Sequence, residues 1–162
     1  MKHRAFVLLV SLAHCAPLGV FDDGDRVPPP SDATNVDAGT LAIEVGGGYD
    51  AFEPLTDGAP VDIILGPQGG HHIWTSLRVS DTTLDHVLLY VSARFADNGA
   101  SVGSPSRLSS TLTLVDGARE RLGLTNFVDD PAVAHGRRIV LRVEVQADDG
   151  RIGVDERAVV AR

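Results

Sequence analysis

The sequence has little of what disulfides, soft metal sites and basic ligand surfaces require. One of its 162 residues is cysteine and one is methionine, so an intramolecular disulfide is excluded and thiolate or thioether metal sites are poorly supplied. Lysine also occurs once, as Lys2, and the other basic residues are arginines. The formal net charge is −8 at pH 7, and so acidic a surface repels phosphate backbones. We therefore expect no nucleic-acid partner.

The N-terminal apolar run is too short to cross a membrane. It covers residues 5–13 and is broken only by Ser11, whereas a spanning helix needs about 20 apolar residues. Lys2 and Arg4 precede the run, which gives the charged and apolar parts of an export signal. Residues 1–15 are therefore interpreted as a signal peptide.

The single cysteine follows this run in the segment Leu12-Ala13-His14-Cys15. The segment resembles the lipobox of bacterial lipoproteins, in which the cysteine receives lipid and becomes the mature N-terminus. His14 departs from that motif, where a small residue normally precedes the cysteine. A plain secretory signal, cut after Ala13 or Cys15, is the alternative interpretation.

The lipobox resemblance implies that the membrane is a partner, reached through lipid on Cys15. In well-studied lipoproteins, an aspartate after the cysteine is associated with retention at the inner membrane, and here that position holds Ala16. We therefore expect an exported outer-membrane lipoprotein that faces the periplasm or the cell surface.

Residues 16–39 have the composition of a spacer. They contain four prolines, three of them consecutive, and five aspartates against one arginine, Arg26. Low hydrophobicity, acidic charge and proline are typical of extended, disordered linkers. The cluster Asp22-Asp23-Gly24-Asp25 lacks the alternating spacing and the distal glutamate of a calcium loop. We predict a disordered tether behind the lipid anchor.

Residues 40–162 alternate apolar and polar side chains with period two, which is typical of half-buried strands. The pattern is clearest where Ile139, Leu141, Val143 and Val145 are separated by more polar positions. The 17 glycines and 9 prolines favour turns over long helices. We expect strands over residues 41–45, 61–65, 71–79, 86–95, 107–115, 139–146 and 152–160.

Turn sequences separate these segments, and residues 119–124 supply one helical turn at most. The turns are Asp57-Gly58, Gly66-Pro67-Gln68-Gly69-Gly70, Asn98-Gly99, Asp116-Gly117 and Asp149-Gly150. Short strands with such breaks predict an all-β fold, an antiparallel immunoglobulin-like β-sandwich over residues 40–162.

Two resemblances accompany this pattern. Residues 136–145, with Asp148-Asp149-Gly150 and Asp155-Glu156 after them, look like the closing strands of immunoglobulin-like and fibronectin-like bacterial surface modules, which implies the fold and no ligand. Phe52-Glu53-Pro54-Leu55 and the run from Asp57-Gly58 into Gly-Pro-Gln-Gly-Gly-x-His are similar to uncharacterised envelope lipoproteins of Gram-negative bacteria. This second resemblance, over residues 44–79, implies an envelope location and brings no activity.

The glycine-rich turn Gly66-Pro67-Gln68-Gly69-Gly70 has two interpretations. As architecture it is a rigid hairpin or a corner between sheets, because glycine permits positive φ and proline fixes one dihedral. As a site it is a cradle whose exposed amides meet an anionic or backbone ligand. A phosphate loop is excluded, because no lysine follows and no helix opens there.

The strand after the turn carries the candidate residues for partner binding. His72, Trp74 and Arg78 share one face, and the opposite face has the better apolar count. We therefore expect Trp74, the only tryptophan, outside the main core, although sandwich tryptophans also serve as core plugs. With Gln68 of the turn, these three residues form the predicted surface for a protein or glycan partner.

We expect Trp74 either to be covered by the loop of residues 46–55 or to be offered to that partner. Tyr49 and Phe52 are the aromatic residues of the loop.

A metal-binding protein is the alternative function. Adjacent residues on a strand point to opposite faces, so His71 and His72 cannot easily bind one ion together. Zinc or copper would need one of them joined in space by His86 and His135, with a carboxylate from Asp50, Glu53 or Asp85.

Catalysis has thin support, because the serines near Gly103 and Ser104 lack a strand–turn–helix context and the carboxylates are scattered over turns. We expect no enzymatic activity and no cofactor. The expected function is a binding or structural module of the envelope.

Lipidation of Cys15 is the first testable prediction. Because the cysteine lies directly after the apolar run, mass spectrometry of the mature N-terminus should show a diacylglyceryl adduct on it. The same preparation from a Cys15→Ser variant should lack the adduct. An unmodified N-terminus at His14 or Ala16 in the natural sequence would contradict the anchor.

Overall fold

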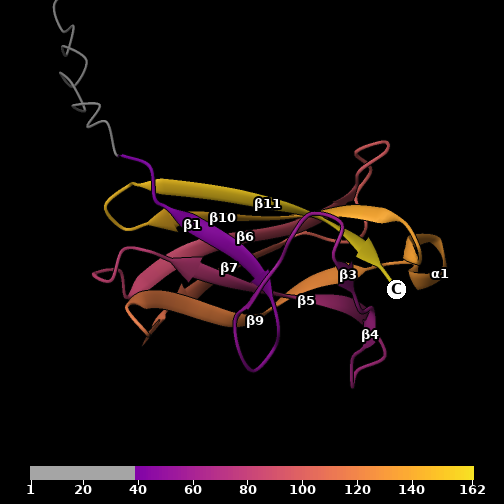
Figure 1. Cartoon of the computed structure of the whole chain (residues 1–162), viewed down its shortest axis with the longest axis horizontal. Coiled ribbons are helices and arrows are strands. Elements are labelled where there is room, and N and C mark those ends of the chain that lie inside the picture. Colours follow the sequence, from indigo (N-terminus) through magenta and orange to yellow (C-terminus); the bar gives the residue numbers. More distant parts are fainter. Residues whose placement is uncertain (1–38) are drawn as a thin grey trace, which may run out of the picture. The chain divides into compact units, whose positions relative to one another are not determined.

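The computed structural model describes residues 39–162. The predicted signal peptide, Cys15 and nearly all of the predicted tether lie outside the described residues. The elements labelled in Figure 1 are β1 (Ile43–Gly47), β2 (Glu53–Pro54), β3 (Pro60–Val61), β4 (Ile64–Leu65), β5 (His71–Val79), β6 (His86–Phe95), β7 (Ser106–Thr111), β8 (Thr113–Val115), β9 (Ala118–Val128), α1 (Pro131–Ala134), β10 (Arg138–Ala147) and β11 (Ile152–Ala161). No helix in this part of the chain is long and apolar enough to cross a membrane.

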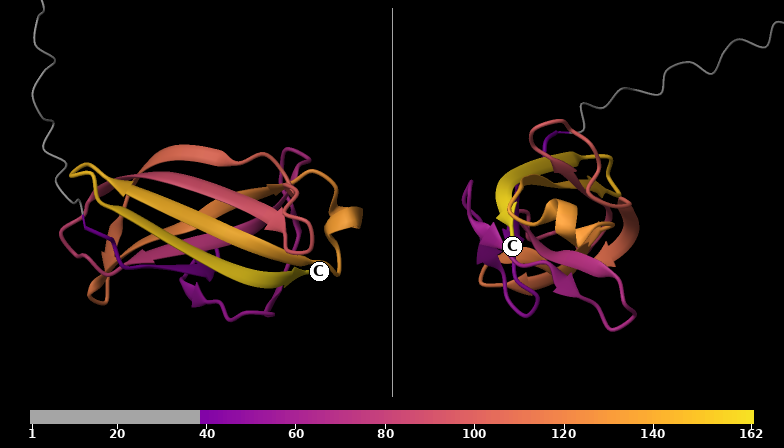
Figure 2. Two further views of the ribbon diagram at one scale, coloured as in Figure 1. Left: turned by 90° about the horizontal axis from the view of Figure 1, so that it is seen from above. Right: turned by 90° about the vertical axis from the view of Figure 1, so that its right-hand side faces the viewer.

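The strands form two sheets that pack face to face (Figure 2). In the first, called the β5 sheet, the order is β2-β1-β5-β9-β8, and β4 also pairs with β5. In the second, called the β10 sheet, the order is β3-β11-β10-β6-β7. Every pair is antiparallel except β3 with β11. This arrangement confirms the predicted all-β, antiparallel immunoglobulin-like sandwich.

The core lies between the sheets and follows from the alternation. On β10 the four inward-facing residues Ile139, Leu141, Val143 and Val145 are fully buried, and on β6 Leu89 and Val91 are buried beside them. Burial of one such side chain stabilises a fold by about 1.5–3 kcal/mol relative to exposure. Strands β5 and β6 begin and end at the predicted residues.

A polar pair divides this core into two apolar clusters. Thr75 of β5 and Asn126 of β9 are both buried, and Asn126 Nδ2 donates a hydrogen bond of 2.6 Å to Thr75 Oγ1. Leu124 belongs to one cluster and Val128 to the other, on either side of Asn126. Asn126 Oδ1 is buried without a hydrogen-bond partner in the described structure, so the pair depends on this single hydrogen bond.

The prediction of one strand over residues 107–115 is wrong. The chain pairs with β6 as β7 and then leaves for the other sheet, where β8 pairs with β9. Leu112 is buried at the crossing point, whereas Leu114 is 54% exposed and does not share the face of Leu108 and Leu112. The change of sheet interrupts the alternation that the sequence pattern had suggested.

The prediction of one strand over residues 61–65 is wrong for the same reason. Val61 ends β3 in the β10 sheet, and Ile64 begins β4 in the β5 sheet. Between them, Asp62 accepts a 2.6 Å hydrogen bond from Arg162 Nε. The chain therefore crosses between the sheets next to its C-terminal strand.

Residues 119–124, for which the sequence allowed one helical turn at most, are a strand. These residues belong to β9, which carries a bulge where Leu122 and Gly123 lie opposite Ser76 of β5. Two residues opposite one shift the phase of the alternation, so the period-two pattern is hidden in the sequence. Within residues 39–162 the one helical turn is α1, which begins after Asp130, whose carboxylate accepts hydrogen bonds from two backbone amides of the helix.

The Thr75–Asn126 pair generates a stability prediction. Thr75→Val removes the acceptor and leaves the Asn126 amide buried and unpaired, so the free energy of unfolding should fall by about 1–3 kcal/mol. Replacing both partners, as Thr75→Val with Asn126→Leu, should cost less than the single change. Urea denaturation measures both, with exposed Thr113→Val as the matched control, expected within about 0.5 kcal/mol of the natural protein. A single variant as stable as the control would show that the hydrogen bond contributes nothing.

Candidate functional site

The candidate site lies on the outer face of the β5 sheet, the face turned away from the core. After β1 the chain leaves the sheet as a loop, residues 48–52, before it returns at β2 (Figure 1). Ser76 Oγ on β5 donates a hydrogen bond of 2.7 Å to the Gly48 carbonyl oxygen. Gly48 has a φ of 87°, which favours glycine. The loop is thus fixed to the middle of β5.

Two glycines of the sheet make room for the aromatic rings of this loop. A Cβ atom at Gly46 would lie 2.6 Å from the Phe52 ring, and one at Gly123 would lie 3.1 Å from the Tyr49 ring. Gly123 is also the bulge residue and has a φ of 64°. The two rings therefore lie directly on the backbone of β1 and β9.

Trp74 is half-buried on this outer face and belongs to neither apolar cluster of the core. Its ring centroid lies 4.7 Å from that of Tyr49 and 4.2 Å from that of His72, the latter edge-on. The loop of residues 48–52 therefore covers Trp74 in part, as expected for Tyr49. Phe52 contacts a different residue of the strand, Arg78.

Arg78 is held by its own chain. Its Nε and Nη2 donate to Glu120 Oε1 at 3.0 and 2.8 Å, and its Nη1 lies 3.9 Å from Glu44 Oε2. The guanidinium carbon lies 4.0 Å from the centroid of the Phe52 ring, within the range of a cation–π interaction. The structure therefore gives Arg78 a structural role on the face where the sequence suggested partner contact.

His72 is enclosed on the same face. It is only 7% exposed, and its Nε2 is buried without a hydrogen-bond partner in the described structure. The cross-strand neighbours Ile64 of β4 and Phe127 of β9 flank it in register, and Gly66 lies over the ring. Burial, followed by the charge of neighbouring His71, lowers the pKa of His72 below its ordinary value.

The glycine-rich turn connects β4 and β5 as a hairpin. The Gly66 amide donates to the Gly70 carbonyl oxygen at 2.7 Å, and the Gly69 amide donates to the Gly66 carbonyl oxygen at 2.9 Å. This is the architectural interpretation, and Gln68 is exposed at the tip. An open hollow of about 470 Å³ lies beside the turn, against His71 and Phe127.

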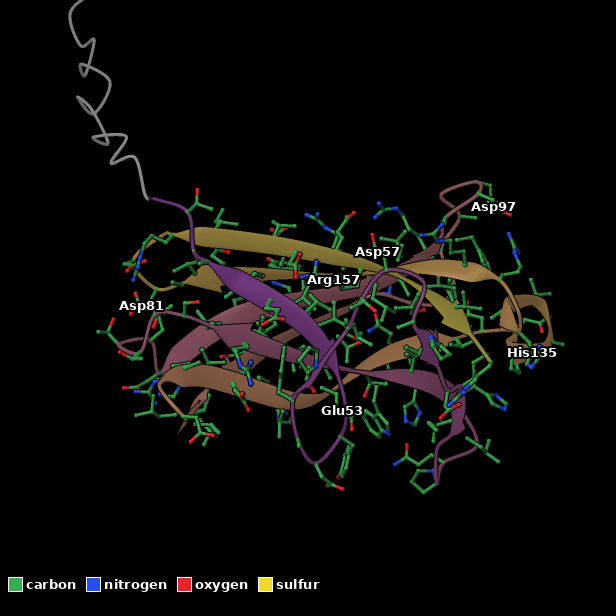
Figure 3. All side chains as sticks on the ribbon, in the orientation of Figure 1. Glu53, Asp57, Asp81, Asp97, His135 and Arg157 are labelled. Carbon is green, nitrogen blue, oxygen red and sulfur yellow. The ribbon has the colours of Figure 1, made fainter. Side chains whose placement is uncertain are left out.

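The central hollow of the site adjoins Trp74 and is called the Trp74 hollow. Its volume is about 250 Å³, and its lining includes Gly47, Gly48, Glu53, Ile64, Ile73 and Trp74. It lies where β1 ends and before β4 begins, so it opens at the edge of β5. Glu53 is exposed beside this opening (Figure 3).

Exposed apolar side chains surround these residues. On this face Tyr49 is 57%, Ile64 37% and Phe127 46% exposed. Leu65 is 64% exposed but pairs with His71, so its side chain lies on the opposite face of the sheet. Sequence reasoning missed Ile64, Leu65 and Phe127. Recognition of β9 as a strand would have placed Phe127 outward. It alternates with the inward-facing residues Asn126 and Val128.

The four histidines of the metal alternative do not come together. His86 lies beside Asp149 and Arg151, and Arg151 pairs with Asp81. Asp81 and His135 lie at opposite ends of the sandwich (Figure 3). Within residues 39–162 no three His, Cys, Asp or Glu side chains are grouped to hold a metal ion.

The enclosure of His72 predicts a pH dependence of stability. Since burial lowers its folded-state pKa below the ordinary value of about 6.5, the unfolded chain binds the proton more tightly. The stabilising contribution is therefore complete above about pH 6.5 and is lost as pH falls below it. Urea denaturation from about pH 7.5 to about pH 5 should show this loss.

The same measurement on His72→Phe should show a smaller loss across this range, whereas Thr113→Val, an exposed substitution on β8, should behave as the natural protein. Equal pH dependence in His72→Phe and the natural protein would contradict the assignment.

Comparison with known proteins gives no sequence family and a weak structural likeness. No family model matches the sequence, and no curated protein matches it. Among solved structures, the chain is similar to the CooA pilin subunit from enterotoxigenic Escherichia coli, with 12% sequence identity and a TM-score of 0.34. The alignment covers 74% of this chain and 96% of the pilin subunit. A likeness at this level carries no argument about function.

Proposed function

We propose that this chain is a lipid-anchored binding module of the bacterial envelope, without catalytic activity, that captures a macromolecular partner on the outer face of the β5 sheet. The anchor is Cys15, and the acidic residues 16–39 hold the domain away from the outer membrane. The proposal on location draws on the export signal, the lipobox resemblance and the spacer composition.

One observation carries the binding function. The only tryptophan of the chain is placed outside the core, in the wall of an open hollow, and exposed apolar side chains of β4 and β9 lie next to it. Exposed apolar clusters of this kind on a soluble domain mark interaction sites. Tryptophan is also among the residues that most often dominate interface energetics.

Gln68 extends this surface beyond the apolar cluster. It stands exposed at the tip of the β4–β5 hairpin, where its amide can donate and accept hydrogen bonds. Arg78 and His72 support the surface from within, because the first is ion-paired and the second is enclosed. The binding residues proposed are therefore Trp74, Tyr49, Phe127 and Gln68.

Trp74→Ala tests this function when folding and capture are measured on the same protein. A fully buried tryptophan would cost about 3–5 kcal/mol of stability. Because Trp74 is half-buried outside the core, the loss should be well below that range. Capture of a partner from envelope extract should weaken by about 30-fold, the equivalent of about 2 kcal/mol.

The matched control is Leu114→Ala, which removes an exposed apolar side chain on β8, away from the hollow. It should fold and capture the partner as the natural protein does. Gln68→Ala should fold normally and weaken capture to a smaller extent. If Trp74→Ala and Gln68→Ala both fold and retain full affinity, the outer face of β5 is not the binding surface.

A further inference from the structure

The edge of β5 that faces the Trp74 hollow is paired at both ends and open in the middle. On this edge β1 pairs with β5 from Val79 to Ser76, and β4 pairs with His72 and His71. The other edge is occupied by β9. Residues 73–75 therefore have a strand on one side only, and the hollow lies on the other.

The backbone groups of Trp74 point toward this opening. In an antiparallel pair, alternate residues turn their N–H and C=O groups to opposite sides of the strand. The Ser80 amide donates to the Ala42 carbonyl oxygen, on the β1 side, at 3.1 Å. The bulge adds its extra residue to β9, so the alternation along β5 is unbroken and Trp74 faces the same side as Ser80.

The alternation on β1 leads to the same conclusion. The Val45 amide donates to Asp155 Oδ2 at 2.7 Å, away from β5. Val45 is opposite Leu77, so the backbone groups exchanged between β1 and β5 are those of the even-numbered residues of β5. Trp74 is the next even-numbered residue beyond the end of β1, and no strand is paired opposite it on this edge.

The walls of the opening leave space for a backbone. Gly47 and Gly48, at the end of β1, carry no side chains, and Ile64 closes the opposite end. The open stretch of three residues is about 10 Å long. Asp62 and Arg162 also line the hollow and pair with each other. The carboxylate of Glu53 at the mouth has no ion-pair partner in the described part of the chain, so it is the unpaired charge of the lining.

We propose that the Trp74 hollow takes a short extended polypeptide segment of the partner, with a basic side chain, which exchanges two backbone hydrogen bonds with Trp74. A peptide unit offers the adjacent donor and acceptor that an unpaired strand residue requires, which is the basis of strand addition to a sheet edge. The basic side chain complements Glu53 at the mouth. This proposal rests on the proposed binding function and names the chemical class of the partner.

A glycan fits these observations less well. A sugar ring binds tryptophan by stacking flat on an open ring face, whereas the Trp74 ring already contacts both Tyr49 and His72. The outward contribution of Trp74 is then its backbone and the remaining ring edge.

Amide hydrogen exchange tests the first step on the domain without any ligand. The Trp74 amide should exchange much faster than the amides of Ile73 and Thr75, which face β9. Equal protection of the three amides would overturn the proposal, because Trp74 would already have a partner.

Binding is tested with the capped peptide acetyl-Val-Arg-Val-amide, followed by the backbone amide shifts of the protein. The peptide should shift and protect the Trp74 amide. The same peptide methylated on the arginine backbone nitrogen should bind at least about tenfold more weakly, because one of the two hydrogen bonds is lost. Equal binding of the two peptides, or binding of neither, would overturn the proposal, as would cellobiose shifting Trp74 when the peptide does not.

Gly47→Val adds a side chain to the lining of the hollow, and a Cβ there makes only ordinary contact with its nearest neighbour, Leu55, at 3.5 Å. It should abolish peptide binding and leave the domain folded. Gly70→Val is the control, because a Cβ at Gly70 meets open space in the hairpin turn. Peptide binding that survives Gly47→Val with the fold intact would place the segment elsewhere.

The experiments distinguish failure of the polypeptide assignment from failure of the proposed binding function. If Trp74→Ala weakens capture of the envelope partner while the peptides do not bind, only the polypeptide assignment is lost.

Discussion

The register between β5 and β9 is the constraint on which the site depends. Side chains alternate across a strand, so a slip of one residue would turn the outer face of β5 into the core and bury Trp74. The buried hydrogen bond between Asn126 and Thr75 opposes such a slip, because moving either strand by one residue turns one of the two polar groups to the other face and leaves its partner unsatisfied in an apolar interior. The apolar clusters on either side supply the stabilisation, and the polar pair selects one register.

The bulge in β9 belongs to the same constraint. Because Leu122 and Gly123 absorb the extra residue, β5 alternates without interruption from His71 to Val79. Gly123 also provides the surface on which Tyr49 packs. The bulge in β9 therefore leaves the side-chain alternation of β5 unbroken and positions the Tyr49 ring beside Trp74.

The two outer faces of the sandwich differ in how many of their polar groups already have partners within the chain. On the β10 sheet Arg94 and Arg142 both pair with Glu156, and Arg142 also pairs with Glu144. Such exposed pairs contribute little to stability individually, but they leave few unpaired charges for a partner. The outer face of the β5 sheet combines an aromatic ring, exposed apolar groups and an unpaired backbone edge, which is why the binding site is proposed there.

The sequence predicted the long strands β5, β6, β10 and β11 well, and the alternation is most regular in β6 and β10, where it continues for ten residues. The side of β5 that carries Trp74 followed from the same alternation. The changes of sheet at Asp62 and Leu112 were not predicted. Strand-forming residues lie on both sides of each position, and the sequence does not show that the two sides pair with different sheets. The ion pair of Arg78 was equally hidden, because Glu120 lies in the segment whose pattern the bulge obscures.

The sheet change at Asp62 bears on function through the edge of β5. Because the chain leaves the β10 sheet only after Val61, β4 is two residues long and cannot cover the edge that β1 leaves open. Open strand edges invite uncontrolled association, and proteins usually keep them short or charged. Here the opening is limited to three residues, is bounded by β1 and β4, and has Glu53 at its mouth. The open stretch is too short to pair with a long strand. It is long enough for one residue of the proposed partner segment to exchange backbone hydrogen bonds with Trp74.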